Sequence, residues 1–350
     1  MRTMRAMVLE GVEDYNLREV PVPAVPPHGI LLKVMANGVC RSDWHKWHGH
    51  YSRIYPKILG HEMCGVVEEV GELVTRHKVG DRVMIPVSGS EGTCEMCKAG
   101  HGNLCESYLV PGIGYDGGFA EYVAVPYADR NAEPLPENVT FEEGAILSCR
   151  YITGFKGVVE AAKVKIGEWV AVYGCGGVGL ASVQTASKMG AFVIAVDVKA
   201  EALELAKKMG ADHVVDASAG DPVEEILKIT NGRGVDVAIE ALGNKNVMVQ
   251  CFNSLAKLGR LCQLGVTQLG PEGDASIPVN PVVQKEITIV GSLSSPIQGF
   301  KPMLELVAAG KLDVKPLLAE TCTLTQVVDI FKRMDNNDVV GAVVCNDFSR

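Results

Sequence analysis

Three stretches in the N-terminal third of the chain carry side chains that bind transition metals. Cys40-Arg-Ser-Asp43 and Gly60-His61-Glu62 supply a thiol, an imidazole and carboxylates, which together are the material of a zinc site. The third stretch is a glycine-rich loop that holds Cys94, Cys97 and Cys105. Three thiolates with a fourth donor would close a tetrahedral structural zinc there.

A glycine pattern at mid-chain is typical of dinucleotide binding. Gly174-x-Gly176-Gly177-Val178-Gly179 follows one expected strand and opens a helix, and Asp197 ends the next expected strand. The glycines allow a tight turn and a close approach of the pyrophosphate, while the carboxylate can hold a ribose diol. A Lewis acid and a hydride carrier in one chain indicate redox chemistry on an alcohol or a carbonyl.

The residues around Asp197 also bear on the choice of cofactor. Its carboxylate would repel a 2′-phosphate, and no arginine follows it closely in the sequence. Lys199 partly offsets this repulsion. The sequence therefore favours NAD over NADP, with Lys199 as a neighbour of the cofactor.

The elements that must position these residues fall into two parts. A chain of 350 residues exceeds the size at which one hydrophobic core keeps growing, so two domains are expected. Up to about Glu133 short β-type runs alternate with Gly, Pro and Asn, which predicts an irregular antiparallel β domain with strands over 30–35, 65–70 and 82–85. After Tyr151 strands and helices alternate, which predicts a doubly wound parallel sheet. The expected strands there are 169–173, 192–197, 213–215, 235–240, 260–264 and 287–290, the expected helices are 178–189 and 201–209, and the tail carries a helix over 301–309 and a strand over 341–345.

Composition excludes several classes of partner. The net charge is −9, so there is no electrostatic reason to bind nucleic acid or an anionic membrane surface. The N-terminus shows no apolar stretch of signal-peptide length. Eleven cysteines in such a chain fit metal ligation and reduced buried thiols better than disulfides, and they indicate the cytoplasm.

With these motifs the chain resembles the zinc-dependent alcohol dehydrogenases of the medium-chain dehydrogenase/reductase family, over essentially its whole length. The resemblance implies an α/β fold with two domains. A GroES-like β-rich catalytic domain with the zinc sites would comprise residues 1–150 and 294–350. A Rossmann domain that binds NAD would comprise residues 151–293.

The resemblance also implies ligands for two zinc ions in each subunit. Cys40, His61 and Cys149 match the ligands of the catalytic zinc, which leaves one coordination position for water or substrate. Glu62 matches a residue that swings in as an alternate ligand, and Asp43 matches the carboxylate that orients the imidazole of His61. In the structural lobe this chain departs from the family pattern of four cysteines, because Glu91 stands at the first position before Cys94, Cys97 and Cys105. A carboxylate is an acceptable zinc ligand, and Glu91 fits the spacing better than His101 does.

Further roles follow from the same resemblance. The alcohol proton would leave through Ser42, the cofactor ribose and then His45, with His48 and His50 as close competitors for the last step. Arg41 matches a residue that contacts the cofactor pyrophosphate. Thr153 and Val178 match positions that contact the nicotinamide ring.

The substrate is the least constrained feature of the sequence. The resemblance implies a mixed aromatic and aliphatic pocket, because segments that line the family's pocket here contain Trp44, Trp47, Val87, Tyr115 and Leu293. A primary or secondary alcohol with its aldehyde or ketone is the expected substrate, and a polyol or an amino alcohol is the alternative. More distant alternatives are a zinc-free relative that reduces a double bond or a quinone, and a non-catalytic zinc and NAD(H) sensor. The resemblance also implies a homo-oligomer, a tetramer rather than a dimer, paired through the strand over 287–290.

Overall fold

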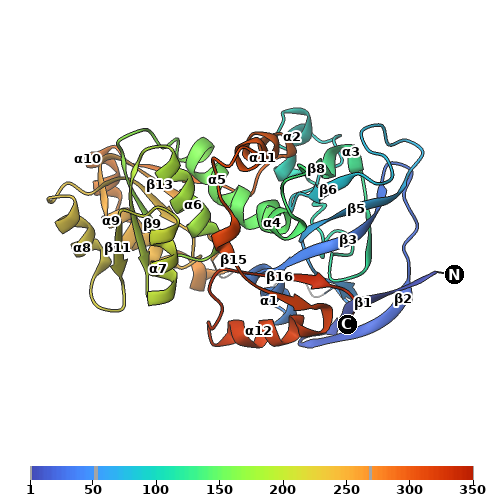
Figure 1. The fold of residues 1–350 in the computed structure, drawn as a ribbon. Helices are drawn as coiled ribbons and strands as arrows, with labels where there is room; N and C mark the ends of the chain where they lie inside the picture. The colour runs from blue at the N-terminus through green and yellow to red at the C-terminus, as the bar shows by residue number, and fades with distance from the viewer. Residues whose placement is uncertain (1, 51–53, 268–269, 350) are drawn as a thin grey trace. The chain divides into compact units, whose positions relative to one another are not determined.

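The computed structural model describes residues 2–50, 54–267 and 270–349 of the chain, which divides into two compact units (Figure 1). One unit comprises Met1–Cys149 together with Ser294–Arg350, and the other comprises Arg150–Leu293. Among the described residues, no helix is long and apolar enough to cross a membrane.

The unit Arg150–Leu293 is built on one parallel sheet of six strands. These are β9 (Trp169–Tyr173), β10 (Phe192–Asp197), β11 (His213–Asp216), β12 (Val235–Glu240), β13 (Leu255–Gln263) and β14 (Thr288–Gly291). They lie in the order β11-β10-β9-β12-β13-β14, so the direction of winding reverses between β9 and β12. This is the strand order of a Rossmann fold, which confirms the predicted doubly wound sheet.

Helices before and between the strands cover both faces of this sheet (Figure 1). They are α5 (Ile152–Lys156), α6 (Gly177–Lys188), α7 (Ala200–Lys208), α8 (Pro222–Ile229), α9 (Lys245–Asn253) and α10 (Val279–Lys285). The sequence predicted α6 and α7 but left α8 and α9 unassigned. Their starts carry local signals, since the side chain of Asp221 accepts a hydrogen bond from the backbone N–H of Val223 (2.8 Å) and Asn244 caps α9 in the same way.

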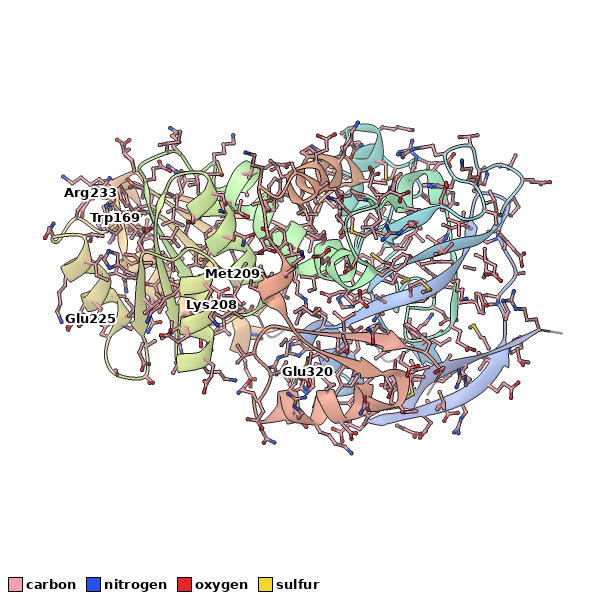
Figure 2. The ribbon with its side chains drawn as sticks, in the orientation of Figure 1. Trp169, Lys208, Met209, Glu225, Arg233 and Glu320 are labelled. Carbon is pink, nitrogen blue, oxygen red and sulfur yellow. The ribbon has the colours of Figure 1, made fainter. Side chains whose placement is uncertain are left out.

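A side-chain contact joins neighbouring strands at one end of this sheet. The backbone N–H of Trp169 donates to the carboxylate of Asp236 (2.9 Å), which also pairs with Arg233. Figure 2 shows Trp169 and Arg233 at this same end.

The other unit is mostly antiparallel β structure. A small sheet has the order β2 (Asp14–Pro21), β1 (Thr3–Gly11), β4 (Lys57–Ile58). The larger sheet follows the order β15 (Leu318–Thr323), β16 (Ala342–Asp347), β3 (Ile30–Val39), β5 (Glu62–Val70), β6 (Arg82–Ile85), β8 (Glu133–Pro134), and β7 (Tyr122–Val125) also pairs with β3. Short helices lie between the strands: α1 (Arg41–Trp47), α2 (Glu95–Lys98), α3 (Ala128–Asn131) and α4 (Phe141–Ile146).

The C-terminal segment completes this unit with α11 (Phe300–Ala308), β15, α12 (Val327–Asp335) and β16. Val327, Ile330, Phe331 and Met334 recur at helical spacing and are all buried in the core of the unit, so their burial stabilises α12. An ion pair of 2.6 Å between Glu320, labelled in Figure 2, and Arg333 links β15 to α12. The sequence predicted α11 and β16 but did not assign β15 or α12.

Candidate functional site: a metal centre and a nucleotide-binding loop

The register of two antiparallel strands brings the first three donors together. Gly38 of β3 lies opposite Glu62 of β5, so Cys40, just after β3, and His61, just before β5, come to the same edge of the sheet. Cys40 also caps the amino terminus of α1. The positions of Cys40, His61 and Glu62 are therefore fixed by the sheet.

Cys149 reaches the same place from a helical segment. Thr140 and Glu143 form a reciprocal capping box at the start of α4, with Thr140 Oγ1 accepting from the N–H of Glu143 (3.2 Å). The chain then widens into a π-helical turn over Leu147–Tyr151 that contains Cys149, a conformation that often occurs at functional sites. The N–H of Val87 donates to the carbonyl of Ser148 (3.2 Å) and steadies this turn.

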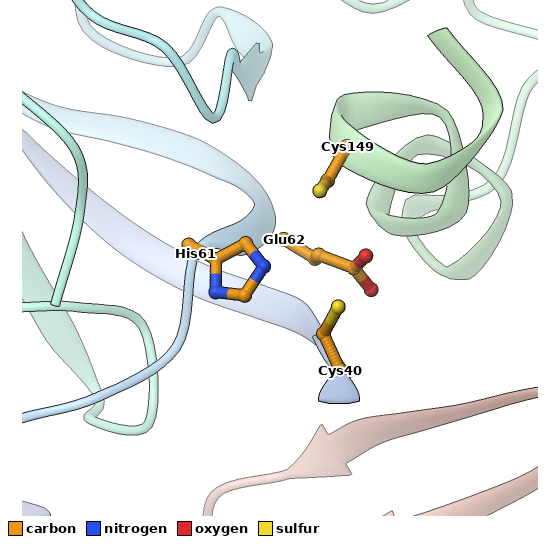
Figure 3. A group of neighbouring side chains, drawn as sticks. All are labelled: Cys40, His61, Glu62 and Cys149. Carbon is orange, nitrogen blue, oxygen red and sulfur yellow. The ribbon is translucent and has the colours of Figure 1, made fainter. Parts of the chain in front are cut away.

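Figure 3 shows the resulting group of Cys40, His61, Glu62 and Cys149. One donor atom from each lies within 4.8 Å of the donor atoms of the others. Two thiols, an imidazole and a carboxylate form a donor set that suits zinc. Because a catalytic zinc needs three protein ligands and an open position, the group has the donors that such a site requires.

The buried carboxylate of Asp43 holds His61 in place. It accepts hydrogen bonds from His61 Nδ1 (3.0 Å) and from the backbone N–H of Gly60 (3.1 Å). His61 Nε2 is thus the nitrogen left to bind a metal. Burial lowers the pKa of His61, but the charges of Asp43 and Cys40 outweigh it and raise this pKa well above its usual range.

Gly38 is required by the packing of Glu62. A Cβ at position 38 would lie 2.0 Å from Glu62 Oε2 and 3.0 Å from Glu62 Cβ. Glu62 is fully buried, and its carboxylate lies close to Gly38 and belongs to the donor group. Any larger residue at position 38 would therefore displace this carboxylate.

The predicted relay residues lie on α1 next to the donors. Ser42 is exposed, and its Oγ lies 3.9 Å from Cys40 Sγ. His45 is half-buried one turn further along, and its Nδ1 lies 3.0 Å from Nδ1 of His50. Both ring nitrogens of His48 are bonded to carboxylates, those of Glu13 (2.7 Å) and Asp335 (2.9 Å).

The second cysteine cluster forms as well, but without Glu91. Sulfur atoms of Cys94, Cys97 and Cys105 lie within 4.8 Å of one another. Backbone N–H groups of Glu106 and Cys97 lower the pKa of Cys94 to about 7, which favours a thiolate ready for a metal. The carboxylate of Glu91 accepts from Thr93 Oγ1 (2.8 Å) and lies outside this group. The predicted fourth ligand is thus engaged by the side chains of Ser107 and Thr93 and is not part of the thiol cluster.

Arg41 and Trp44 are engaged with α12 and the residues after it. Arg41 donates to the carbonyl of Met334 (3.0 Å) and to Asn337 Oδ1 (2.9 Å), and its guanidinium lies over the ring of Trp44. The indole N–H of Trp44 donates to Asp335 (2.6 Å). Arg41, the residue predicted to contact the pyrophosphate, is therefore hydrogen-bonded to the C-terminal end of α12, which is distant in the sequence.

The glycine loop between β9 and α6 has the form that a dinucleotide requires. Gly174 has a φ of +91°, and a Cβ on Gly179 would lie 1.7 Å from the carbonyl oxygen of Gly174, so neither position accepts a side chain without strain. A Cβ on Gly176 would meet only open space within the described chain, which leaves room for a pyrophosphate. Gly176 also caps α6, which begins at Gly177 and includes Val178.

Asp197 at the end of β10 is tied to this loop. Its Oδ2 accepts from the backbone N–H of Cys175 (2.7 Å), and its Oδ1 accepts from the N–H of Val198 (2.8 Å) and of Lys199 (3.0 Å). Each carboxylate oxygen has two lone pairs, so the group can still accept from a ribose hydroxyl. Lys199 precedes α7 as its N-cap.

The helices α5 and α6 pack closely beside the loop. A Cβ on Gly154 would lie 2.6 Å from the carbonyl oxygen of Val178, which explains the glycine that follows Thr153. This glycine therefore lets α5, which carries Thr153, approach the start of α6, which carries Val178.

The predicted substrate pocket stays a prediction, and of its residues only Tyr115 lines the larger of two cavities in the described chain. A cavity of about 490 Å³ is lined by Tyr115 together with residues of β1, β2, β4 and β7, but not by Trp44 or Val87. Trp47 is buried in the core, Val87 lies beside the turn that carries Cys149, and Leu293 is 48% exposed.

Two buried ionisable residues were not singled out from the sequence. The side chain of Arg150 packs against Gly177, where a Cβ would lie 2.5 Å from Arg150 Cδ. Glu240 ends β12 fully buried and accepts hydrogen bonds from the backbone N–H groups of Leu242 and Gly243 (3.0 and 2.9 Å) and from the side chain of Gln263. A carboxylate at the end of an apolar strand, three residues before a glycine, was the available signal for Glu240.

Comparison with known proteins agrees with this geometry. Residues 26–137 match the family model of the alcohol dehydrogenase GroES-like domain, and residues 177–309 match that of the zinc-binding dehydrogenases. An alcohol dehydrogenase of Geobacillus stearothermophilus is 36% identical, with 97% of each chain covered. An NAD-dependent alcohol dehydrogenase of Sulfurisphaera tokodaii is 34% identical over 97% of this chain and 99% of its own. A sorbitol dehydrogenase of Bacillus subtilis is 33% identical over 95% and 94%.

Solved structures lead to the same family. The alcohol dehydrogenase of Thermus sp. ATN1 superposes with a TM-score of 0.92 at 30% identity and covers 98% of this chain and 100% of its own. A zinc-binding dehydrogenase of Sinorhizobium meliloti bound to NADP gives a TM-score of 0.90 at 32% identity, over 99% and 100%. The GroES-like and Rossmann architecture expected from the sequence is confirmed. This chain belongs to the zinc-dependent alcohol dehydrogenases of the medium-chain dehydrogenase/reductase family.

Proposed function

We propose that this enzyme uses NAD(H) to interconvert a primary or secondary alcohol and its aldehyde or ketone. The observation that carries the proposal is the group of Cys40, His61, Glu62 and Cys149, whose donor atoms lie within 4.8 Å of one another. Beside it stands an exposed hydroxyl, that of Ser42. These are the groups that an alcohol oxygen needs in order to be bound and to lose its proton.

Cys40, His61 and Cys149 would hold the catalytic zinc, and Glu62 would serve as the alternate ligand. When bound, zinc supplies a Lewis acid that polarises the substrate oxygen. Asp43 bonds Nδ1 of His61, so Nε2 would be the nitrogen that holds the zinc. Ser42 would accept the proton of the alcohol, and His45 would receive it after the cofactor ribose.

The cofactor assignment rests on Asp197. Its carboxylate lies against the glycine loop and would repel a 2′-phosphate, while it can accept from a ribose hydroxyl. Gly174, Gly176 and Gly179 leave the space for the pyrophosphate, and Arg41 has N–H donors beyond the two used at α12 and Asn337. Because a relative of known structure is bound to NADP, Lys199 needs a direct test. We expect Lys199→Ala to lower affinity for NADP and to leave that for NAD within about twofold.

We propose a second, structural zinc at Cys94, Cys97 and Cys105. Glu91 would become its fourth ligand after its carboxylate leaves Ser107 and Thr93. If Glu91 ligates, Glu91→Ala lowers the zinc content per chain while Thr93→Ala leaves it unchanged. Equal zinc content in the wild type and Glu91→Ala would reject Glu91 as a ligand.

Oligomer formation through β14 is also proposed. β14 is an edge strand of its sheet, Ile289 on it is 42% exposed, and Val279 and Val283 of α10 are 73% and 70% exposed. Such an apolar edge favours pairing with a second copy, and we expect a tetramer located in the cytoplasm.

The test of the function is reduction of NAD and of NADP with primary, secondary, poly- and amino alcohols, in the wild type and in Cys40→Ala. We expect NAD to be preferred, simple alcohols to be the better substrates and Cys40→Ala to be inactive. Polyols are included because one relative is a sorbitol dehydrogenase. A strong preference of the enzyme for polyols would make a polyol, instead of a simple alcohol, the proposed substrate. A wild-type protein that holds zinc and oxidises none of these alcohols would refute the proposal.

A further inference from the structure

Three imidazoles gather at the C-terminal end of α1 around one indole ring. The ring of Trp44 makes edge contacts with His45, His48 and His50 at centroid distances of 4.8, 4.5 and 5.5 Å. Only His45 has a place in the mechanism so far. The other two differ from each other in what their ring nitrogens contact.

His48 is a structural anchor. Its Nδ1 bonds Glu13 (2.7 Å) and its Nε2 bonds Asp335 (2.9 Å), which joins α1 to the β1–β2 hairpin and to the end of α12. With both nitrogens held by carboxylates, His48 is not placed to pass a proton from His45 to water.

His50 lies beside His45 because the chain reverses between them. Gly49 has a φ of +67°, in the left-handed region that favours glycine. The reversal lets the N–H of His50 donate to the carbonyl of His45 (2.9 Å), and it brings the Nδ1 atoms of the two rings within 3.0 Å. At this distance one Nδ1 carries a proton and the other accepts it.

The difference in solvent exposure between His45 and His50 indicates the direction in which a proton would move. His45 is half-buried, whereas His50 is exposed to solvent. Burial, followed by the charges of His50 and Arg41, lowers the pKa of His45 to about 4. The charge of Cys40 favours the protonated form of His45, and the charge of His48 disfavours it. The net effect is that His45 holds a proton weakly.

We propose that His50 is a further residue of the proton relay, which takes the proton from His45 and releases it to solvent. The proposal rests on the dehydrogenase function described above. A proton arrives at Nε2 of His45 while the proton on Nδ1 passes to Nδ1 of His50. The resulting imidazolium of His50 then loses its Nε2 proton to water or buffer, and exchange with water resets the tautomers. No net charge remains on either ring.

The first test concerns the free protein and needs no turnover. In protein with isotope-labelled histidine, nitrogen NMR reports which ring nitrogen of His45 carries the proton and whether it is hydrogen-bonded. We expect His50→Ala to shift the Nδ1 resonance of His45 and His48→Gln to leave it in place. An unchanged His45 resonance in His50→Ala would mean that the two rings are not paired, and it would refute the proposal.

The second test is the dependence of alcohol oxidation on buffer concentration. A small buffer can replace a missing proton acceptor, whereas it does not repair a purely structural loss. In dilute buffer we expect His50→Ala to lower kcat by about tenfold, and added imidazole to restore most of it. The wild type and His48→Gln should show no such dependence. A His50→Ala enzyme that keeps full activity in dilute buffer, or whose loss is not restored, would refute the role of His50.

The two outcomes separate this proposal from the function on which it rests. If the wild type oxidises no alcohol while the NMR pairing is present, the proposed function fails. If the wild type is active and His50→Ala shows neither effect, the function stands and the role of His50 fails.

Discussion

Asp43 offers the sharpest quantitative prediction, because its carboxylate stands behind a proposed zinc ligand and can be changed with little change of shape. In Asp43→Asn the amide oxygen can still accept from His61 Nδ1 and from the N–H of Gly60, which both bond the same oxygen, Oδ1. Only the charge is lost, together with the longer contact from the N–H of Cys40 (3.4 Å). Loss of such a carboxylate behind a metal-bound histidine typically weakens metal binding by about 10- to 100-fold, which is about 1.4–2.8 kcal/mol.

Asp43→Ala should cost more, and for a separate reason. It removes the acceptor of a buried backbone N–H, which adds about 1–3 kcal/mol of lost folding stability. The pair of variants therefore separates the electrostatic contribution from the hydrogen bond.

The assay is competition for zinc between the protein and a chromogenic chelator. The zinc ion that the wild type binds and Cys40→Ala does not is assigned to the site beside Asp43. A matched control is Asp129→Asn, since Asp129 also accepts backbone N–H groups, those of Thr75 and Arg76, but in a different loop. We expect the control to alter stability and leave zinc affinity unchanged. Zinc affinity in Asp43→Asn within about threefold of the wild type would refute the reasoning.

Three further predictions concern stability and assembly. Glu240→Ala should destabilise the Rossmann unit by about 3–5 kcal/mol, because it leaves buried N–H groups without an acceptor, and a loss below about 1 kcal/mol in urea unfolding would contradict this. Burial, then the charge of Arg76, lowers the pKa of His77, so the folded state binds a proton less readily than the unfolded state does. The contribution of neutral His77 to folding stability is present above the unfolded pKa of about 6.5 and is lost as the pH falls toward the folded pKa. His77→Phe should therefore lose less stability than the wild type between about pH 7 and pH 5. Equal losses in the two proteins would refute this assignment. Ile289→Glu should place a charge at the exposed edge of β14 and lower the oligomeric state measured by light scattering, whereas an unchanged mass would place the interface elsewhere.

The fold was predictable from the sequence where its signals are local. Apolar runs such as Trp169–Tyr173 and Phe192–Asp197, followed by helical spacing, predicted the parallel sheet, and the structure has these strands at the same bounds. α12 was not assigned although its buried residues recur at helical spacing, and β15 was not assigned because only Cys322 on it is fully buried. Periodicity is a weak signal for a strand that is half exposed.

Contacts within the site were less predictable, because they depend on side chains distant in sequence. Cys149 lies far along the chain from Cys40, and its place among the donors followed from the family resemblance and not from spacing. Nothing local to Arg41 indicates its hydrogen bonds to the end of α12. Glu91 fits the ligand spacing, but its carboxylate is engaged by the side chains of Ser107 and Thr93. The choice between His48 and His50 needed the positions of Glu13 and Asp335.

The central claim is that Cys40, His61 and Cys149, with Glu62 beside them, hold the zinc at which alcohols react. Its most direct test is zinc content per chain by elemental analysis, for the wild type and for Cys40→Ala. We expect two zinc ions in the active wild type and one in Cys40→Ala, which should no longer oxidise alcohols. A Cys40→Ala protein that keeps its full zinc content and its activity, or an active wild type that contains no zinc, would contradict the account.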